Sequence, residues 1–222
     1  MQLIIDNDKA EIKNQEFRIK NQELRTKNQE SGIENKEPRT KNQDVSDLTS
    51  HISILDIGTG SGCISIALKK SISTAKVYAS DVSKEALEVA KQNAIMNNVD
   101  VQFLQHDILT ENNQFPVKDL KFDIIVSNPP YIGISEKEQM QNNVLNHEPH
   151  LALFVNDADP LLFYRAIADF ALNNLKQNGK LYFEINQAYG PETKQLLEEK
   201  GFKNIILVKD LNNNNRILYC NI

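Results

Sequence analysis

The segment Asn128-Pro129-Pro130-Tyr131 has the residue types that would bind a planar NH2 group. Its prolines restrict the backbone and lack an N–H, so nearby carbonyl groups are free to accept hydrogen bonds. The Asn128 side-chain oxygen and the Pro129 carbonyl match the two NH2 hydrogens, and Tyr131 can stack on the plane. We predict Asn128, Pro129 and Tyr131 as catalytic, and all four residues as substrate-binding. In isolation, a proline-rich turn capped by asparagine is the alternative.

The chemistry expected from this segment is transfer to a weakly nucleophilic nitrogen. The lone pair of an amide or arylamine nitrogen is delocalised, which makes that nitrogen a poor nucleophile. Acceptors that hold both hydrogens raise the electron density on the nitrogen as it attacks an electrophile. No general base is then required before the transfer.

A second segment of chemical interest is the run Leu55 to Gly62, in which an apolar strand ends in D-x-G-x-G-x-G and passes into a helix. Gly58, Gly60 and Gly62 allow a tight turn and a close approach of the backbone to a ligand. The amides at the helix start favour a negative group, either the pyrophosphate of a dinucleotide or the carboxylate of S-adenosylmethionine. The third interpretation of this glycine segment is a turn with a purely structural role.

Acidic residues follow the next two predicted strands. Asp81 lies 21 residues after Gly60, where a carboxylate can accept hydrogen bonds from ribose hydroxyls. Asp107 and Ile108 could bracket an adenine ring, although Asp107 could instead cap a loop. Asp56 either holds the glycine loop or contacts the cofactor. The predicted cofactor-binding residues are Asp56, Gly58, Thr59, Gly60, Ser61, Gly62, Asp81, Asp107, Ile108 and Asn128.

Short apolar strands alternate with amphipathic helices from about residue 50 onward, which predicts an α/β fold with a parallel sheet covered on both faces. The last two strands have no helix between them, so we expect an antiparallel hairpin at the sheet edge. The expected strands are 51–57, 75–80, 101–104, 122–127, 181–185, 204–210 and 216–222. The expected helices are 62–70, 84–96 capped by Ser83, one from Asp159-Pro160 to near Gly179, and 191–200.

The first part of the chain has a different texture. Residues 12–46 are five units of seven residues, such as IKNQEFR and TKNQDVS. The recurring apolar positions are the first and sixth of each unit, a spacing that forms no continuous coiled-coil seam, and Pro38 would interrupt a helix. We therefore expect 1–47 to be a low-complexity extension, disordered or weakly helical, and 48–222 to be the catalytic domain.

The composition narrows the function classes. The chain has 222 residues, is 40% hydrophobic and carries a net charge of −5, without the excess of Lys and Arg that nucleic-acid binders usually concentrate. No apolar run is long enough to span a membrane and no signal peptide is visible, so we expect a cytoplasmic protein. Cys63 and Cys220 have no partners at ligand spacing, so we expect two core thiols and no metal site.

Residues 52–222 resemble the peptide-chain release factor glutamine methyltransferases of the class I fold. Segments beyond the two motifs carry this likeness: HEPHLALF at 147–154, DPLLFYRAI at 159–167, EINQAYG at 184–190 and DLNNNNRILYCNI at 210–222. The resemblance implies a Rossmann-like, seven-stranded, mostly parallel sheet. It also implies S-adenosylmethionine as the cofactor, and a release factor, through its GGQ glutamine, as the protein partner. NPPY alone is shared with adenine N6 and guanine N2 methyltransferases of nucleic acids, which is the alternative.

The chain departs from this family pattern in two places. The usual N-terminal helical domain and its linker are not visible, and the KNQE repeat stands in their place. A cofactor-binding remnant with little activity is therefore a further alternative. Asn212 to Asn215 replace a usual glycine, and we expect this change to lie away from the chemistry.

Overall fold

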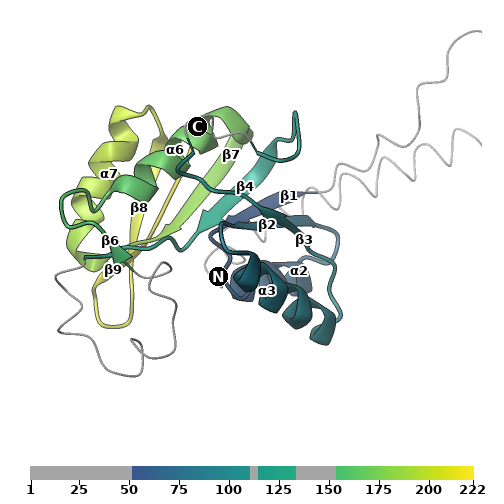
Figure 1. The fold of residues 1–222 in the computed structure, drawn as a ribbon. Helices are drawn as coiled ribbons and strands as arrows, with labels where there is room; N and C mark the ends of the chain where they lie inside the picture. The colour runs from purple at the N-terminus through teal and green to yellow at the C-terminus, as the bar shows by residue number, and fades with distance from the viewer. Residues whose placement is uncertain (1–51, 111–114, 134–153) are drawn as a thin grey trace, which may run out of the picture. The chain divides into compact units, whose positions relative to one another are not determined.

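The computed structural model describes residues 52–110, 115–133 and 154–222. Its strands form a seven-stranded sheet in the order β3-β2-β1-β4-β7-β9-β8, shown in Figure 1. The predicted extension 1–47 and most of the segment 147–154 lie outside the described residues. The strands of this sheet are β1 (Ser53–Ile57), β2 (Lys76–Asp81), β3 (Gln102–Gln105), β4 (Phe122–Ser127), β7 (Leu175–Glu184), β8 (Lys203–Lys209) and β9 (Asn215–Asn221). The helices are α2 (Cys63–Ser71), α3 (Lys84–Met96), α6 (Leu162–Asn174) and α7 (Gly190–Glu199), with a 3-10 turn at Gln187–Tyr189.

The parallel part of the sheet reverses its winding at β1. This strand pairs in parallel with β2 on one side and with β4 on the other, and Ile57 is level with Ser127 in the register. The glycine loop and the NPPY segment therefore leave the same edge of the sheet from neighbouring strands. A crevice at such a switch point is where open α/β sheets bind ligands.

The last two strands form the expected antiparallel hairpin. β9 pairs antiparallel with both β7 and β8, so β8 becomes the edge strand. Because Glu184 at the end of β7 is level with Ile217 near the start of β9, the turn between β8 and β9 lies at the carboxyl end of β7. The seven-stranded, mostly parallel prediction is confirmed.

The helices divide between the two faces, as predicted. Leu55, Ile57 and Ile125 belong to a buried cluster that also contains Tyr164 and Ile167 of α6. The neighbouring residues of the strands point to the other face, where α2 and α3 contact β1, β2 and β3. Fully burying a side chain of this size contributes about 1.5 to 3 kcal/mol, so this sheet-and-helix core anchors the edge that bears the motifs.

Local signals account for most element boundaries, and α6 is the exception. Ser83 caps α3 by accepting a hydrogen bond from the Ala86 N–H at 3.1 Å, as predicted. α6 begins at Leu162 rather than at Pro160, because the Asp159 carbonyl accepts the Leu162 N–H in a preceding turn. It also ends well before Gly179, because the chain enters β7 at Leu175 and pairs there with β4 across a register shift.

A two-stranded parallel sheet follows the NPPY segment, formed by β5 (Ile132–Gly133) and β6 (Phe154–Val155). One cysteine prediction is confirmed and one is wrong: Cys220 is buried, whereas Cys63 is exposed at the first turn of α2. In the described ranges, no helix has the length and apolar character needed to cross a membrane.

Candidate active site

The glycine loop leaves open space beside its backbone at two positions. Gly58 and Gly60 have φ of +71° and +56°, a left-handed conformation that disfavours a side chain. A Cβ on either residue would have no atom within 4 Å. Gly62 has φ of +85° but differs, since its Cβ would lie 3.0 Å from Ile66 Cδ1 and 3.1 Å from Ala90 Cβ. Gly62 therefore permits α2 to pack against α3, while the other two border a cradle.

Asp56 holds the loop from beneath. It is 1% exposed, and its Oδ2 accepts from Thr59 Oγ1 at 2.6 Å and from the Ser65 N–H at 3.1 Å. Burial raises the pKa of Asp56 to about 6, against the lowering effect of these hydrogen bonds. Its Oδ1 accepts no hydrogen bond within the described part of the chain. Two roles were predicted for Asp56, and its hydrogen bonds support the role of holding the glycine loop. The Thr59 hydroxyl takes part in the same role, because it donates one of these bonds.

Asp81 joins the end of β2 to the glycine loop. Its Oδ2 accepts from the Gly60 N–H at 2.8 Å, and its Oδ1 accepts from the Ser83 N–H at 2.9 Å. Each carboxylate oxygen has two lone pairs, so both keep acceptor capacity for a ligand hydroxyl. The open cradle and this acceptor pair fit the carboxylate and ribose of S-adenosylmethionine, the cofactor expected from the sequence.

The residues after β3 have mainly structural contacts. Asp107 Oδ1 accepts from the Leu109 N–H at 2.9 Å, which is the loop-cap alternative. Ile108 is 8% exposed and packs in the core cluster. His106, directly after β3, is buried, with its ring 5.5 Å from that of Phe115 and 5.7 Å from that of Phe170. Of the remaining predicted set, Ser61 is exposed, and its carbonyl accepts from Asn93 Nδ2 at 2.9 Å.

The NPPY segment begins where β4 is tied to β1. Ser127 Oγ donates to the Ile57 carbonyl at 2.6 Å, a buried bond that holds the two predicted sites side by side. Asn128 is exposed and no described residue binds its side chain, whereas Pro129 is buried and Pro130 is half-buried. The prolines thus anchor the segment while the Asn128 amide is available to a ligand.

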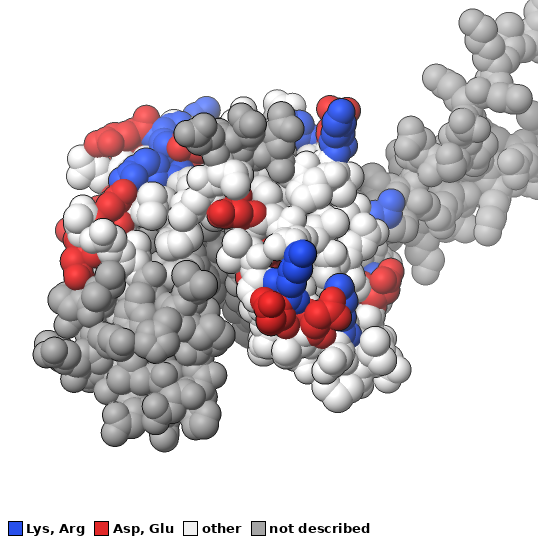
Figure 2. Space-filling model, in the orientation of Figure 1, with Lys and Arg blue, Asp and Glu red and all other residues white. Residues whose placement is uncertain are grey.

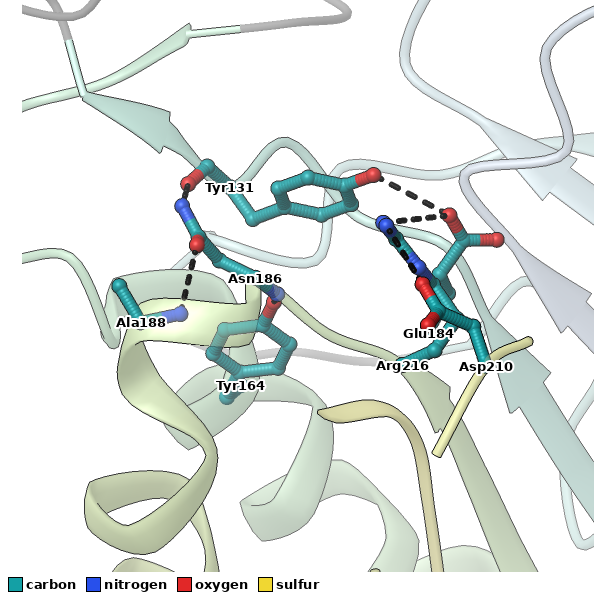
Figure 3. A network of polar contacts seen from close by, with 7 residues as sticks. All are labelled: Tyr131, Tyr164, Glu184, Asn186, Ala188, Asp210 and Arg216. Carbon is teal, nitrogen blue, oxygen red and sulfur yellow. Dashed lines mark hydrogen bonds and ion pairs between the residues drawn. The ribbon is translucent and has the colours of Figure 1, made fainter. Parts of the chain in front are cut away.

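Tyr131 lies in a polar network that Figure 3 shows from close by. Its hydroxyl donates to Glu184 Oε1 at 3.1 Å, and its carbonyl accepts from Asn186 Nδ2 at 3.0 Å. Burial, followed by the charge and hydrogen bond of Glu184, raises the pKa of Tyr131 to about 12. The phenol therefore stays neutral at physiological pH and keeps its hydrogen for Glu184.

Asn186 is a residue that the sequence reasoning missed. It is 7% exposed, and its Oδ1 accepts from the Ala188 N–H at 2.9 Å while its own N–H donates to the Tyr164 hydroxyl at 3.3 Å. The available signal was its place directly after a buried strand at the ligand-binding edge of the sheet. Its contacts with residues 22 and 55 positions earlier had no local signature.

The asparagine run, expected to lie away from the chemistry, is linked by contacts to the predicted site residue Tyr131. Asp210 and Arg216 flank that run, and Arg216 Nη1 lies 3.9 Å from Glu184 Oε1 while its Nη2 lies 3.4 Å from Asp210 Oδ2. The hairpin turn is thereby joined to the Tyr131 network. It also borders open space at this edge, a groove of about 270 Å³ lined by Gln187, Lys209, Asn213, Asn214 and Asn215.

Known proteins are similar to this chain in sequence and in fold. Residues 48–212 match the family described as Methyltransferase domain. The chain belongs to this family. A solved methyltransferase from Pyrococcus furiosus is similar in fold, with a TM-score of 0.55 and 19% identity over 77% of this chain and 75% of that chain.

Curated relatives with higher sequence identity to this chain are described by a specific activity rather than by a domain family alone. The chain is 54% identical over 173 residues to a release factor glutamine methyltransferase of Flavobacterium psychrophilum, covering 77% of this chain and 59% of the relative. It is 46% identical over 168 residues to a protein of the same description from Bacteroides thetaiotaomicron, covering 76% of this chain and 59% of that protein. The chain thus spans about three-fifths of the length of these relatives.

Proposed function

We propose that this methyltransferase-family chain transfers a methyl group from S-adenosylmethionine to the side-chain amide nitrogen of a protein glutamine. The single observation that carries the proposal is the available Asn128 amide at the end of β4, directly beside the glycine loop at the end of β1. In this arrangement, a hydrogen-bond acceptor for a substrate NH2 group lies next to a loop that fits an adenosyl ligand.

The proposed cofactor contacts divide by the parts of the ligand. The open backbone at Gly58 and Gly60 would receive the amino-acid end, and Asp81 would accept from the ribose hydroxyls. Asp107 and Ile108 would border the adenine, with their other contacts holding that loop in place. When bound, S-adenosylmethionine supplies an electrophilic methyl group on its sulfonium.

The proposed catalytic work of the chain is to orient and polarise the glutamine amide. The Asn128 side-chain oxygen and the Pro129 carbonyl would accept its two hydrogens, and the half-buried Tyr131 ring would pack on its plane. Holding both hydrogens shifts electron density onto the nitrogen as it attacks the methyl carbon. The surplus proton then leaves the methylated nitrogen to solvent, so no side chain needs to act as a base first.

The proposed physiological substrate is the GGQ glutamine of a peptide-chain release factor. Its support is the similarity to relatives with that description, at 54% and 46% identity. Figure 2 adds that basic and acidic side chains are interspersed on the face shown. Proteins that bind nucleic acids usually concentrate Lys and Arg on the binding surface, which differs from this mixed distribution of charge. We propose that residues 48–222 carry out this reaction in the cytoplasm, with 1–47 as an extension.

The test is methyl transfer from labelled S-adenosylmethionine to a purified release factor. The wild-type chain should label the factor, and should not label a factor whose GGQ glutamine is replaced by alanine. Asn128→Ala should lower the rate by about a hundredfold or more, because one acceptor is lost from the transition state. S-adenosylmethionine binding should remain measurable in this variant, because the other predicted cofactor contacts, among them Asp81, are retained.

The matched control is Asn173→Ala, which changes an exposed asparagine of α6. The Asn173 carbonyl accepts a hydrogen bond from Lys121, the residue just before β4. Asn173 therefore lies near the opposite end of that strand from Asn128. The activity of this variant should equal that of the wild type. Transfer to RNA or DNA but not to the release factor would reject glutamine in favour of a nucleic-acid amino group. Cofactor binding without transfer to any of these substrates would reject the activity altogether.

A further inference from the structure

Tyr131 is held at both ends by residues at and just after the end of β7. Its phenol donates to Glu184 Oε1 at 3.1 Å, and its carbonyl accepts from Asn186 Nδ2 at 3.0 Å. Figure 3 shows the side chain spanning these two contacts. Rotation of the side chain about χ1 would break the phenol contact, so this contact fixes the position of the ring. Rotation about χ2 leaves the hydroxyl in place, because the oxygen lies on that axis.

Glu184 is in turn held by the C-terminal hairpin. Arg216 of β9 lies between Glu184 and Asp210, at 3.9 Å and 3.4 Å. Asp210 is anchored within the turn, where its Oδ1 accepts the N–H groups of Asn212 and Asn214 at 2.9 and 3.0 Å. A continuous set of contacts thus connects the hairpin turn to the Tyr131 phenol.

We propose that Glu184 and Arg216 are positioning residues for methyl transfer, acting on the acceptor amide through the Tyr131 hydroxyl. This inference rests on the proposed function, in which the Tyr131 ring packs on the amide plane. Misplacement of a reacting group by about 1 Å can cost about a hundredfold in rate, so a fixed position of the ring that packs on the amide has a direct effect on turnover. Arg216 offsets the charge of Glu184, which allows that carboxylate to remain half-buried beside the phenol.

A double-mutant cycle separates this role from simple stabilisation of the hairpin. Glu184→Ala and Tyr131→Phe should each lower kcat by about tenfold, the effect of one hydrogen bond to a charged acceptor. The double variant should be no slower than either single variant, within about twofold, because both changes remove the same contact. Glu184→Gln retains an acceptor oxygen for the phenol and should recover kcat to within about threefold of the wild type.

Arg216→Ala should lower kcat by about threefold to tenfold in the wild type, and have no further effect in Tyr131→Phe. The matched control is Lys209→Ala, an exposed cation of the same hairpin with no contact to Glu184 among the described residues. This control should leave kcat unchanged. S-adenosylmethionine affinity and melting temperature should stay close to wild-type values in every variant with an effect on kcat.

A spectroscopic measurement tests the linkage without depending on turnover. The chain has six tyrosines, and with 13C at their ζ carbons Tyr131→Phe identifies the Tyr131 resonance by its loss. Glu184→Ala and Arg216→Ala should both shift that resonance, whereas Lys209→Ala should not. A wild-type chain inactive on glutamine would reject the proposed function, and the resonance would still decide whether Arg216 and Glu184 control Tyr131.

Three results would overturn the inference. If the kcat losses of Glu184→Ala and Tyr131→Phe multiply in the double variant, Glu184 acts by some route other than the phenol. An unmoved Tyr131 resonance in Glu184→Ala or Arg216→Ala would show that the hairpin does not control the ring. Equal rates for Glu184→Gln and Glu184→Ala would likewise exclude the phenol contact as the cause.

Discussion

Alanine substitutions at Gly60 and Gly62 should separate the cofactor function of the loop from its structural function. Both glycines have left-handed backbones, with φ of +56° and +85°, so each substitution incurs a similar strain of about 1 to 2 kcal/mol. Their surroundings differ. A Cβ at Gly60 meets open space, whereas a Cβ at Gly62 meets Ile66 Cδ1 at 3.0 Å and Ala90 Cβ at 3.1 Å.

The packing conflict predicts a gap in stability between the two variants. Inserting a methyl group into a close-packed contact costs about 1 to 3 kcal/mol, and the Ile66 side chain can yield more readily than the α3 backbone behind Ala90. With about 2 kcal/mol for this conflict, Gly62→Ala should melt about 4 to 8 °C below Gly60→Ala. The measurement is thermal unfolding followed by far-UV circular dichroism.

Cofactor affinity should show the reverse order. The Gly60 methyl group would occupy space proposed for S-adenosylmethionine, and an overlap of about 1 to 3 kcal/mol weakens binding about fivefold to a hundredfold. Gly62→Ala, assayed well below its melting temperature, should bind within about threefold of the wild type, because its methyl group faces α2 and α3. Calorimetric titration at 15 °C measures both. Equal melting temperatures, or equal losses of affinity, would refute this division of roles.

Two further predictions concern titratable groups. The pKa of Asp56 is raised from its ordinary 3.8 to about 6, so its contribution to stability is present below about pH 4 and is lost as the pH rises through about 6. The unfolding free energy of the wild type relative to Asp56→Asn should therefore fall by about 2 kcal/mol between pH 4 and 7 in urea titrations, and a constant difference would contradict this. Cys63 should react with a thiol reagent in the native protein and Cys220 only after unfolding, because Cys220 is 1% exposed and burial raises its pKa to about 12. Two fast thiols in the native state would count against the described burial.

Several parts of the fold were predictable because their signals are local. The alternation of apolar strands and helices, and the Ser83 cap, depend on residues within one turn or one strand of each other. The hairpin followed from the lack of a helix between the last two strands. The start of α6 was misplaced, since Asp159-Pro160 forms a turn before the helix rather than its first residues.

The predicted site was incomplete because its supporting contacts are distant in sequence. The Tyr131–Glu184 contact joins residues 53 positions apart, and it exists because β4 and β7 are neighbours in the sheet. Arg216 reaches Glu184 because β9 inserts between β7 and β8. No spacing rule along the chain contains either fact, so the sequence did not indicate that the asparagine-rich hairpin contacts the Tyr131 network.

The sequence by itself determined the residue types that we propose to meet the ligands. Gly58 and Gly60 permit the left-handed turn, and the prolines beside Asn128 leave carbonyls as acceptors, since both properties are intrinsic to those residues. Tertiary structure alone decided which residues lie behind them, because strand order and register place distant side chains in contact. That is why Gly62 is a packing residue, His106 is buried, and Tyr131 is held by Glu184 and Asn186.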